Sequence, residues 1–256
     1  MTGASAGIGR ELAGIFSENG FDLIAVARSG EKLSLLAKEC HEAHGTRVTV
    51  LPMDLQSPDA PGSLQRAIEE RGLRVDVLVN NAGVVEMGAF REIDHARHQA
   101  LLQLNVSILT SLIHLFLDGM VERGRGRILN VASLAAFQPV PSLALYAASK
   151  AFALSLSESL SEELKGTGVS VTALCPSFTR TAMVDRVRDS NEAARYIPDF
   201  LISDVRQVAR EGYAGCMEGR VVVVPGLGNR LGASAVHLTP RWLVRTVGGL
   251  LGRRAI

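Results

Sequence analysis

Short apolar runs alternate with helix-like segments along most of this chain, and this alternation limits its fold most strongly. Residues 23–27 read Leu-Ile-Ala-Val-Ala, the continuous apolar run expected of a parallel strand that is covered on both faces. Residues 7–19 instead place apolar side chains three and four positions apart, as in a helix packed on one side. Strands that alternate with helices indicate a parallel sheet joined by right-handed crossovers.

The alternation continues to about residue 224. Further strands are predicted at 47–51, 75–79, 127–131, 169–174 and 221–224, and further helices at 30–44, 61–71, 94–122, 143–165 and 203–217. We therefore predict an α/β fold with a doubly wound parallel sheet, the Rossmann fold. The 256 residues, 47% of them apolar, suffice for one large core, and no repeat or low-complexity tract divides them. A single domain is expected.

A glycine-rich turn, Thr2-Gly3-Ala4-Ser5-Ala6-Gly7-Ile8-Gly9, opens the first predicted helix. The first amides of a helix have no partner within it, and with the helix dipole they favour a pyrophosphate. Glycines let a cofactor approach the backbone without Cβ atoms in the way. Such a turn should follow a β-strand, whereas here it begins at residue 2. We expect that the first strand is missing from this N-terminus because the true start lies upstream.

The residue at the end of strand 23–27 distinguishes the two nicotinamide dinucleotides. An acidic residue at this position binds the ribose 2′-hydroxyl of NAD, whereas an arginine accommodates the 2′-phosphate of NADP. This chain has Arg28 there, followed by Ser29 and Lys32. We therefore predict that NADP(H) is preferred over NAD(H). A solvated charge at a strand end is the structural alternative for Arg28.

Tyr146 and Lys150 lie four residues apart in a predicted helix, so both side chains point the same way. A free tyrosine has a pKa of about 10 and is a poor base at neutral pH. A neighbouring ammonium, aided by the positive ring of an oxidised nicotinamide, favours the phenolate. Tyr146 can then donate a proton to a carbonyl oxygen, or accept one during alcohol oxidation. Ser133, just after strand 127–131, would hydrogen-bond the same substrate oxygen.

Three stretches in this order make the chain similar to the short-chain dehydrogenase/reductase family from Thr2 to about Val224: the glycine turn, Asn80-Asn81-Ala82-Gly83, and Ser133 followed by Tyr146-Ala147-Ala148-Ser149-Lys150. The resemblance implies a nicotinamide-dependent oxidoreductase with Ser133, Tyr146, Lys150 and Asn105 as catalytic residues. Asn105 would hold a water molecule for the proton relay. Taken singly, a tyrosine–lysine pair on a helix surface and an interior asparagine that satisfies a backbone group are ordinary features.

The resemblance also assigns the contacts to the cofactor. Asp54 would meet the adenine amino group, Thr181 the nicotinamide carboxamide, and Lys150 the nicotinamide ribose. The predicted cofactor-binding residues are Gly3, Ser5, Gly7, Ile8, Gly9, Arg28, Asp54, Asn81, Ala82, Gly83, Tyr146, Lys150 and Thr181. An ordinary turn explains Asp54 nearly as well. Where similar proteins have Pro-Gly, this chain has Pro176-Ser177, which makes the cofactor geometry near Thr181 less certain.

The last thirty-odd residues differ in character from the rest. We divide the chain into an NADP-binding and catalytic domain, 1–225, and a basic, partly apolar extension, 226–256, packed on it. After Glu218 there are six arginines and no acidic residue, with apolar side chains such as Trp242 between them. One interpretation is a C-terminal helix that covers the substrate cleft or a dimer surface. The other is a basic amphipathic segment that rests on a membrane as a peripheral contact.

Composition excludes several partners. The net charge of +1 gives no reason to expect nucleic acid, and no apolar run approaches the roughly 20 residues of a bilayer span. The three cysteines form no close pair, which indicates reduced thiols in a cytoplasmic protein. Two histidine pairs, His41 with His44 and His95 with His98, have helical spacing for a metal, but exposed helix faces explain them and we predict no metal. The resemblance implies a homodimer or homotetramer built partly on helix 143–165.

Two other functions remain open beside an oxidoreductase acting reversibly on a ketone, an aldehyde or a secondary alcohol. Residues 3–7 also fit Gly-x-Ser-x-Gly, the nucleophile elbow of serine hydrolases, with Ser5, Asp204 and His237 in the order of such a triad. That elbow also needs a preceding strand, and hydrolysis leaves Tyr146 and Lys150 without a joint purpose. The third function is a non-catalytic NADP-binding or interaction protein of the same fold, which the missing strand supports.

Overall fold

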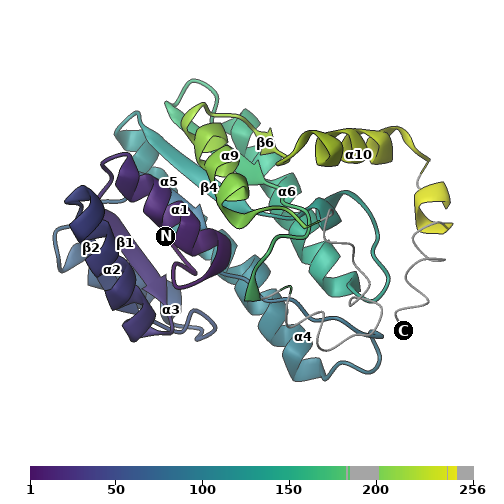
Figure 1. Cartoon of the computed structure of the whole chain (residues 1–256), viewed down its shortest axis with the longest axis horizontal. Helices are drawn as coiled ribbons and strands as arrows, with labels where there is room; N and C mark the ends of the chain where they lie inside the picture. The colour runs from purple at the N-terminus through teal and green to yellow at the C-terminus, as the bar shows by residue number, and fades with distance from the viewer. Residues whose placement is uncertain (183, 185–201, 241, 247–256) are drawn as a thin grey trace.

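Parallel strands with helices on both faces form the centre of the molecule (Figure 1). The computed structural model describes residues 1–182, 184, 202–240 and 242–246. Its strands are β1 (Leu23–Ala27), β2 (Val48–Pro52), β3 (Val77–Asn80), β4 (Gly126–Val131), β5 (Val169–Leu174) and β6 (Val222–Val223). β1 pairs with β2, and β3 to β6 pair in chain order, all in parallel. The predicted doubly wound parallel sheet in a single domain is confirmed.

The two parts of the sheet meet at the first two residues of the chain. The Met1 amino group donates a hydrogen bond to the Ile24 carbonyl at 2.7 Å, and the Met1 carbonyl accepts one from the Val26 amide at 2.9 Å. On the other side, the Thr2 amide donates to the Val79 carbonyl at 2.9 Å. Met1 and Thr2 therefore lie between β1 and β3, but they form only an isolated bridge there. No strand precedes the first helix in the described residues, as the sequence predicts.

Helices cover the sheet in two layers, each closing its own part of the core. α1 (Gly7–Glu18), α2 (Gly30–His44) and α9 (Val205–Met217) lie on one face, where Leu12, Leu33 and Val208 are fully buried. α3 (Ala60–Glu69), α5 (Leu109–Glu122) and α6 (Ala144–Glu163) lie on the other, around Leu64, Leu112 and Ala153. These helices agree with the predicted ranges to within two residues at nearly every end, because one-sided apolar periodicity fixes which face packs on the sheet.

The helix predicted at 94–122 is not uniform. It consists of α4 (His95–Leu102), a wider π-helical turn η1 (Gln103–Ile108) and α5. Such turns are rare and often lie at functional sites. The run His95–Glu122 is long and apolar enough to cross a membrane, with a mean hydropathy of 1.8 in its most apolar stretch. Its buried residues, however, pack in the core of the sheet, so it is a core helix.

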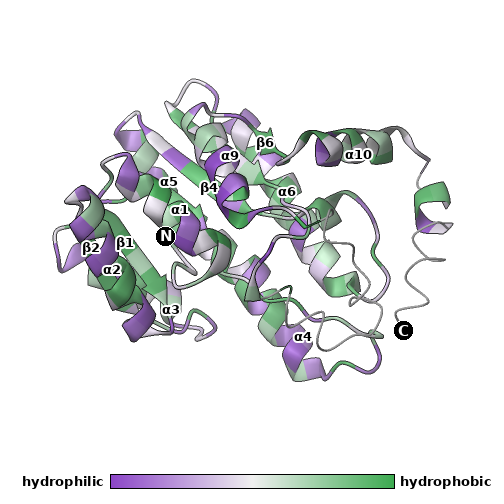
Figure 2. Cartoon of the chain, in the orientation of Figure 1, coloured by the Kyte–Doolittle hydropathy of each residue, from purple (hydrophilic) through white to green (hydrophobic). Residues whose placement is uncertain are grey.

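The structure contains two further helices that are not part of the predicted alternation of strands and helices. The short 3₁₀ helix η2 (Leu134–Phe137) follows Ser133, and α10 (Leu227–Leu238) lies at the edge of the molecule (Figure 1). Apolar residues colour much of α10 (Figure 2), and Leu227 and Leu231 are 77% and 73% exposed. The end of the extension, residues 247–256, and Arg241 lie outside the described residues.

Candidate active site

Three of the predicted catalytic side chains meet beyond the carboxyl end of β4. α6 brings the Lys150 ammonium to 5.7 Å from the centroid of the Tyr146 ring. Ser133 lies two residues after the end of β4, and its hydroxyl hydrogen-bonds the Tyr146 side chain. The four-residue spacing places Tyr146 and Lys150 on one side of the helix, and the sheet places Ser133 opposite them. The arrangement offers a phenol, a hydroxyl and a cation to one substrate oxygen.

Burial dominates the protonation of this group. It raises the pKa of Tyr146, while the hydrogen bond with Ser133 acts in the opposite direction. It also lowers the pKa of Lys150 to about 8, an effect that the nearby Cys175 partly opposes. The Lys150 ammonium donates a hydrogen bond of 2.8 Å to the Val131 carbonyl. In the protein alone burial therefore favours the neutral phenol, because desolvation outweighs the hydrogen bond with Ser133. The phenolate expected from the sequence also depends on the positive ring of a bound oxidised nicotinamide.

Asn105 ties the π-helical turn to the same site. Its amide oxygen accepts a hydrogen bond from the Val84 amide at 2.9 Å, and its amide nitrogen donates to the Val84 carbonyl at 3.0 Å and to the Ser149 hydroxyl at 3.1 Å. The Ser149 hydroxyl in turn donates to the Tyr146 carbonyl at 2.7 Å. Sequence reasoning assigned Ser149 no role. The signal for one was its place between Tyr146 and Lys150, on the buried side of the helix.

The glycine turn owes its shape to close packing on Asn81. Gly3 has a positive φ of 65°, which L side chains rarely adopt. A Cβ atom on Gly9 would lie 2.3 Å from both the Asn81 side-chain nitrogen and the Gly3 carbonyl oxygen. That nitrogen donates hydrogen bonds to the carbonyls of Thr2 at 3.0 Å and Gly3 at 3.1 Å. Gly3 and Gly9 thus leave room for an asparagine as well as for any ligand.

The N-terminal end of α1 has the features of an anion-binding site. Its N-cap residue, Ala6, makes no side-chain capping bond, and the first turn holds no acidic residue. Gly7 begins the helix with a φ of 55°, and a Cβ atom there would lie 3.1 Å from the Thr181 methyl group. The pyrophosphate of a dinucleotide fits this end, since it would find unpaired amides and a favourable dipole there. Ser5 and Ile8 flank the same turn.

Comparison with known proteins agrees with this geometry. The sequence pattern of the family described as short chain dehydrogenase matches residues 1–192. The chain belongs to the short-chain dehydrogenase family. A 7beta-hydroxysteroid dehydrogenase of Clostridium sardiniense is 32% identical over 207 residues, which are 80% of this chain and 78% of that protein. The ketoacyl reductase HetN of Nostoc sp. is 33% identical over 193 residues, 74% of this chain and 66% of its own length.

Solved structures of the family have the same fold. A short-chain dehydrogenase from Sphingobium yanoikuyae, solved in complex with NADPH, superposes with a TM-score of 0.80 at 31% identity and covers 93% of both chains. This chain is therefore an oxidoreductase of the short-chain dehydrogenase family.

The Asn-Asn-Ala-Gly motif of the short-chain dehydrogenases lies between the glycine turn and the catalytic side chains. The amides of Asn81 and Ala82 both donate hydrogen bonds of 3.0 Å to the Thr2 hydroxyl, a buried group that sequence reasoning missed. A Cβ atom on Gly83 would lie 3.2 Å from the Asn105 side-chain oxygen and 3.5 Å from the Lys150 nitrogen. The Asn-Asn-Ala-Gly motif thus joins the glycine turn to the catalytic group.

Two predicted cofactor residues lie at exposed strand ends. Arg28 directly follows β1, and its side chain is exposed. Asp54 is also exposed, and its carboxylate accepts a hydrogen bond of 3.1 Å from the Gln56 amide. This hydrogen bond within a turn is the alternative role that the sequence suggested for Asp54. Ser177 hydrogen-bonds Ser203 at 3.1 Å and accepts a bond from Asn229 at 3.0 Å, so its hydroxyl links this region to α10.

The residues considered for a serine-hydrolase triad and for a metal site have other places in the structure. Asp204 caps α9 by accepting a hydrogen bond of 2.9 Å from the Gln207 amide, Ser5 lies in the glycine turn, and the side chain of His237 lies outside the described part of the chain. The described residues contain no cluster of three side chains suited to a metal. The prediction that His98 lies on an exposed helix face is wrong, because this side chain is only 6% exposed.

Proposed function

We propose that this protein is an NADP(H)-dependent oxidoreductase that reduces a ketone or aldehyde and, in reverse, oxidises a secondary alcohol. The observation that carries the proposal is the grouping of Tyr146 and Ser133 with the buried Lys150, whose ammonium lies 5.7 Å from the centroid of the tyrosine ring. The names of the two relatives, a hydroxysteroid dehydrogenase and a ketoacyl reductase, support a keto or hydroxy substrate.

Each residue of the group has a role in moving one proton. The substrate oxygen takes a hydrogen bond from Ser133, and Tyr146 donates its proton to that oxygen as negative charge develops. Burial raises the pKa of Tyr146, and the neutral phenol that this favours is the form that can donate a proton. The Lys150 ammonium stabilises the phenolate that remains. Asn105 and Ser149 hold the segment around Tyr146 in position through their hydrogen bonds.

A nicotinamide dinucleotide supplies the hydride when it is bound. The residues that would hold it are the uncapped amides at the start of α1, the Asn81–Gly83 segment, Lys150 and Thr181. Arg28, exposed at the end of β1, supports the phosphorylated form, because a guanidinium pairs well with a 2′-phosphate. The NADPH bound to the Sphingobium relative supports the same assignment.

We also propose that the protein is a cytoplasmic homodimer or homotetramer. The described cysteines are all free and buried, which suits a reducing compartment. Phe152 on α6 is 39% exposed, an apolar side chain suited to a subunit contact. The extension from 226 onward would cover the cleft or a partner subunit. Sedimentation with anionic vesicles tests the membrane alternative, and binding that is lost with salt would favour it.

Replacing Tyr146 by phenylalanine tests the proposed reaction. Tyr146→Phe removes the proton donor but keeps the ring, so we expect kcat for NADPH-dependent reduction to fall about 10²–10⁴-fold. Binding of NADPH, followed by fluorescence titration, should change little. The matched control is Tyr213→Phe, which removes the hydroxyl of a tyrosine that packs against Phe16 in α1. The carbonyl panel should include a steroid ketone and a ketoacyl thioester.

The same measurements separate the competing functions. Full activity of Tyr146→Phe would contradict the proton-donor role. NADPH binding by the wild-type protein without turnover of any carbonyl compound would favour the non-catalytic alternative. Ester hydrolysis that is lost in Ser5→Ala, without any NADPH binding, would favour the serine hydrolase.

A further inference from the structure

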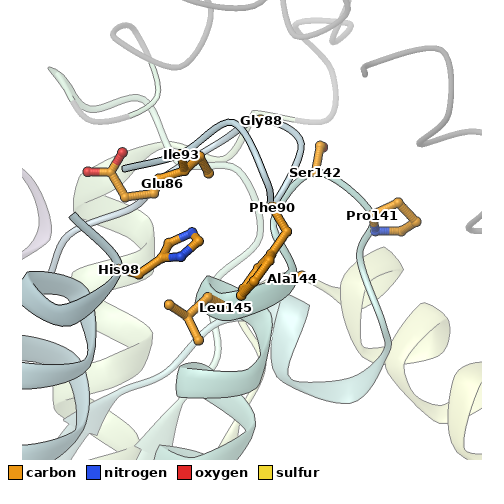
Figure 3. A pocket seen from close by; sticks show the side chains of 9 residues that line it. All are labelled: Glu86, Gly88, Phe90, Ile93, His98, Pro141, Ser142, Ala144 and Leu145. Carbon is orange, nitrogen blue, oxygen red and sulfur yellow. The ribbon is translucent and has the colours of Figure 1, made fainter. Parts of the chain in front are cut away.

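A pocket lies between the loop that follows β3, the start of α4 and the start of α6 (Figure 3). Its volume is about 210 Å³. Most of its wall is apolar and includes Phe90, Ile93, Pro141 and Leu145. Three polar side chains, Glu86, His98 and Ser142, also line it. No role in the proposed reaction has been given to any of them.

His98 carries a polar atom without a partner in this pocket. The side chain comes from α4, is 6% exposed, and its Nε2 atom has no hydrogen bond to any described residue. Figure 3 shows the imidazole directed into the space between Glu86, Phe90 and Leu145. The Phe90 ring stacks on it, with centroids 4.4 Å apart and planes inclined by 29°. Buried polar atoms are nearly always hydrogen-bonded, so Nε2 calls for a ligand.

Water satisfies this atom poorly. A buried water molecule needs two to four polar partners, and the wall around His98 is mostly apolar. Of the other two polar side chains, Glu86 already forms an ion pair with Arg97. Ser142 lies on the other side of Phe90 from the imidazole (Figure 3). A cavity of about 150 Å³ with apolar walls holds a benzene molecule, so the larger pocket here has room for a six-membered ring with a substituent.

We propose that this pocket binds a ring-sized apolar molecule with one hydroxyl or carbonyl oxygen, which hydrogen-bonds His98 Nε2. A neutral imidazole can donate or accept at Nε2 according to its tautomer, and a hydroxyl group can do both. The stacked Phe90 and the aliphatic side chains contact the ring of the ligand. Binding at this site needs no cofactor. Where the ligand is the end of the substrate itself, the inference rests on the proposed function.

Two sources can supply this chemistry. Leu145 directly precedes Tyr146, and Glu86 lies three residues after Gly83, which faces Lys150. The pocket wall thus includes the first turn of α6, the helix that carries Tyr146. The ligand is either the non-reacting end of the substrate or a separate small molecule.

Phenol and toluene test the site, because they share one shape and differ in a hydroxyl against a methyl group. Chemical-shift titrations of the cofactor-free protein would give both dissociation constants for the wild type, His98→Phe and His98→Gln. His98→Phe keeps a ring beside Phe90 but loses Nε2, so we expect the preference for phenol over toluene to fall about tenfold. His98→Gln can place an amide near the position of Nε2 and should retain the preference.

The same preference in His98→Phe as in the wild type, or no binding of either compound by the wild type, would overturn the proposal. Thermal melting checks that each variant folds, and His98→Met removes the same polar atom if His98→Phe does not. Kinetic measurements with added phenol then identify the source. If phenol raises only KM for the carbonyl substrate, the pocket holds the non-reacting end of the substrate. If phenol lowers kcat, the pocket holds a separate ligand. Since the titrations use no cofactor, failure of the proposed reaction would leave their result standing.

Discussion

Burial of Lys150 sets function against stability at the scale of a single residue. The ammonium is needed beside Tyr146, yet burial lowers its pKa from 10.5 to about 8. This shift corresponds to about 3 kcal/mol of unfavourable free energy for the charged form in the folded state. Below pH 8 the lysine is charged in both the folded and the unfolded protein, so the full cost is present. Between pH 8 and 10.5 the folded protein loses the proton first, and the cost disappears.

Lys150→Met should therefore stabilise the cofactor-free protein while it abolishes activity. We expect a gain of about 2 kcal/mol in the free energy of unfolding at pH 7, because loss of the hydrogen bond to Val131 offsets about 1 kcal/mol. The gain should shrink towards pH 10. Urea unfolding at both pH values measures it. Lys165→Met, at an exposed lysine paired with Glu162, is the control and should change little. A destabilised Lys150→Met at pH 7 would contradict the argument.

Arg28 is the residue that we expect to choose between the two dinucleotides. Arg28→Asp replaces a partner for the 2′-phosphate by a repelling charge, so NADPH binding should weaken about 10–100-fold. NADH binding should change by much less. Isothermal titration with both cofactors measures the difference. Arg71→Asp, at an exposed arginine two residues after the end of α3, controls for net charge. Equal losses for both cofactors would rule out this role.

At the scale of elements, α1 shows that two glycines of one helix have opposite effects on stability. A Cβ atom on Gly9 would lie 2.3 Å from the Asn81 side chain and from the Gly3 carbonyl, whereas one on Gly14 meets nothing within 4 Å. Gly9→Ala should therefore destabilise the protein by several kcal/mol and weaken NADPH binding. Gly14→Ala should stabilise it by up to about 1 kcal/mol, since alanine is the better helix former.

Thermal and urea unfolding of both variants check this prediction, with NADPH binding measured alongside. A Gly9→Ala protein as stable as the wild type would mean that the turn can move away from Asn81. The functional part of the glycine motif would then be separate from its packing.

The elements also show where sequence patterns stop being informative. Apolar periodicity predicted the ranges of α1, α2 and β5 closely, because each depends on a local pattern of burial. The π-helical turn Gln103–Ile108 was not predicted. Its asparagine binds the backbone of Val84, a residue far away in the sequence, and no local pattern reports such a contact.

At the scale of the whole molecule, Phe152 is the residue we expect to lie between subunits. It is 39% exposed on α6, and Val121 on α5, in the same layer, is 37% exposed. Phe152→Glu should convert the proposed homo-oligomer to smaller species, because a charge buried in an apolar contact is costly. Analytical ultracentrifugation measures the mass.

Leu35→Glu is the matched control for this variant. Leu35 is 51% exposed on α2, in the opposite layer of helices, so its replacement should leave the assembly unchanged. If Phe152→Glu has the same mass as the wild type, the subunit contact lies elsewhere. A monomeric wild type would contradict the proposed oligomer.

The sequence by itself determined the parallel α/β fold, the family, and the residue types of the candidate site. Strand–helix alternation and the spacing of Tyr146 and Lys150 are local patterns, and local patterns survive without coordinates.

Only the tertiary structure decided the environment of those residues. It showed that burial keeps Tyr146 neutral, that Gly9 packs on Asn81, and that His98 is buried with an unpartnered nitrogen. Protonation and ligand binding depend on which distant groups exclude water from a side chain. That exclusion arises from contacts between segments far apart in the chain, so it follows from the fold and not from the order of residues.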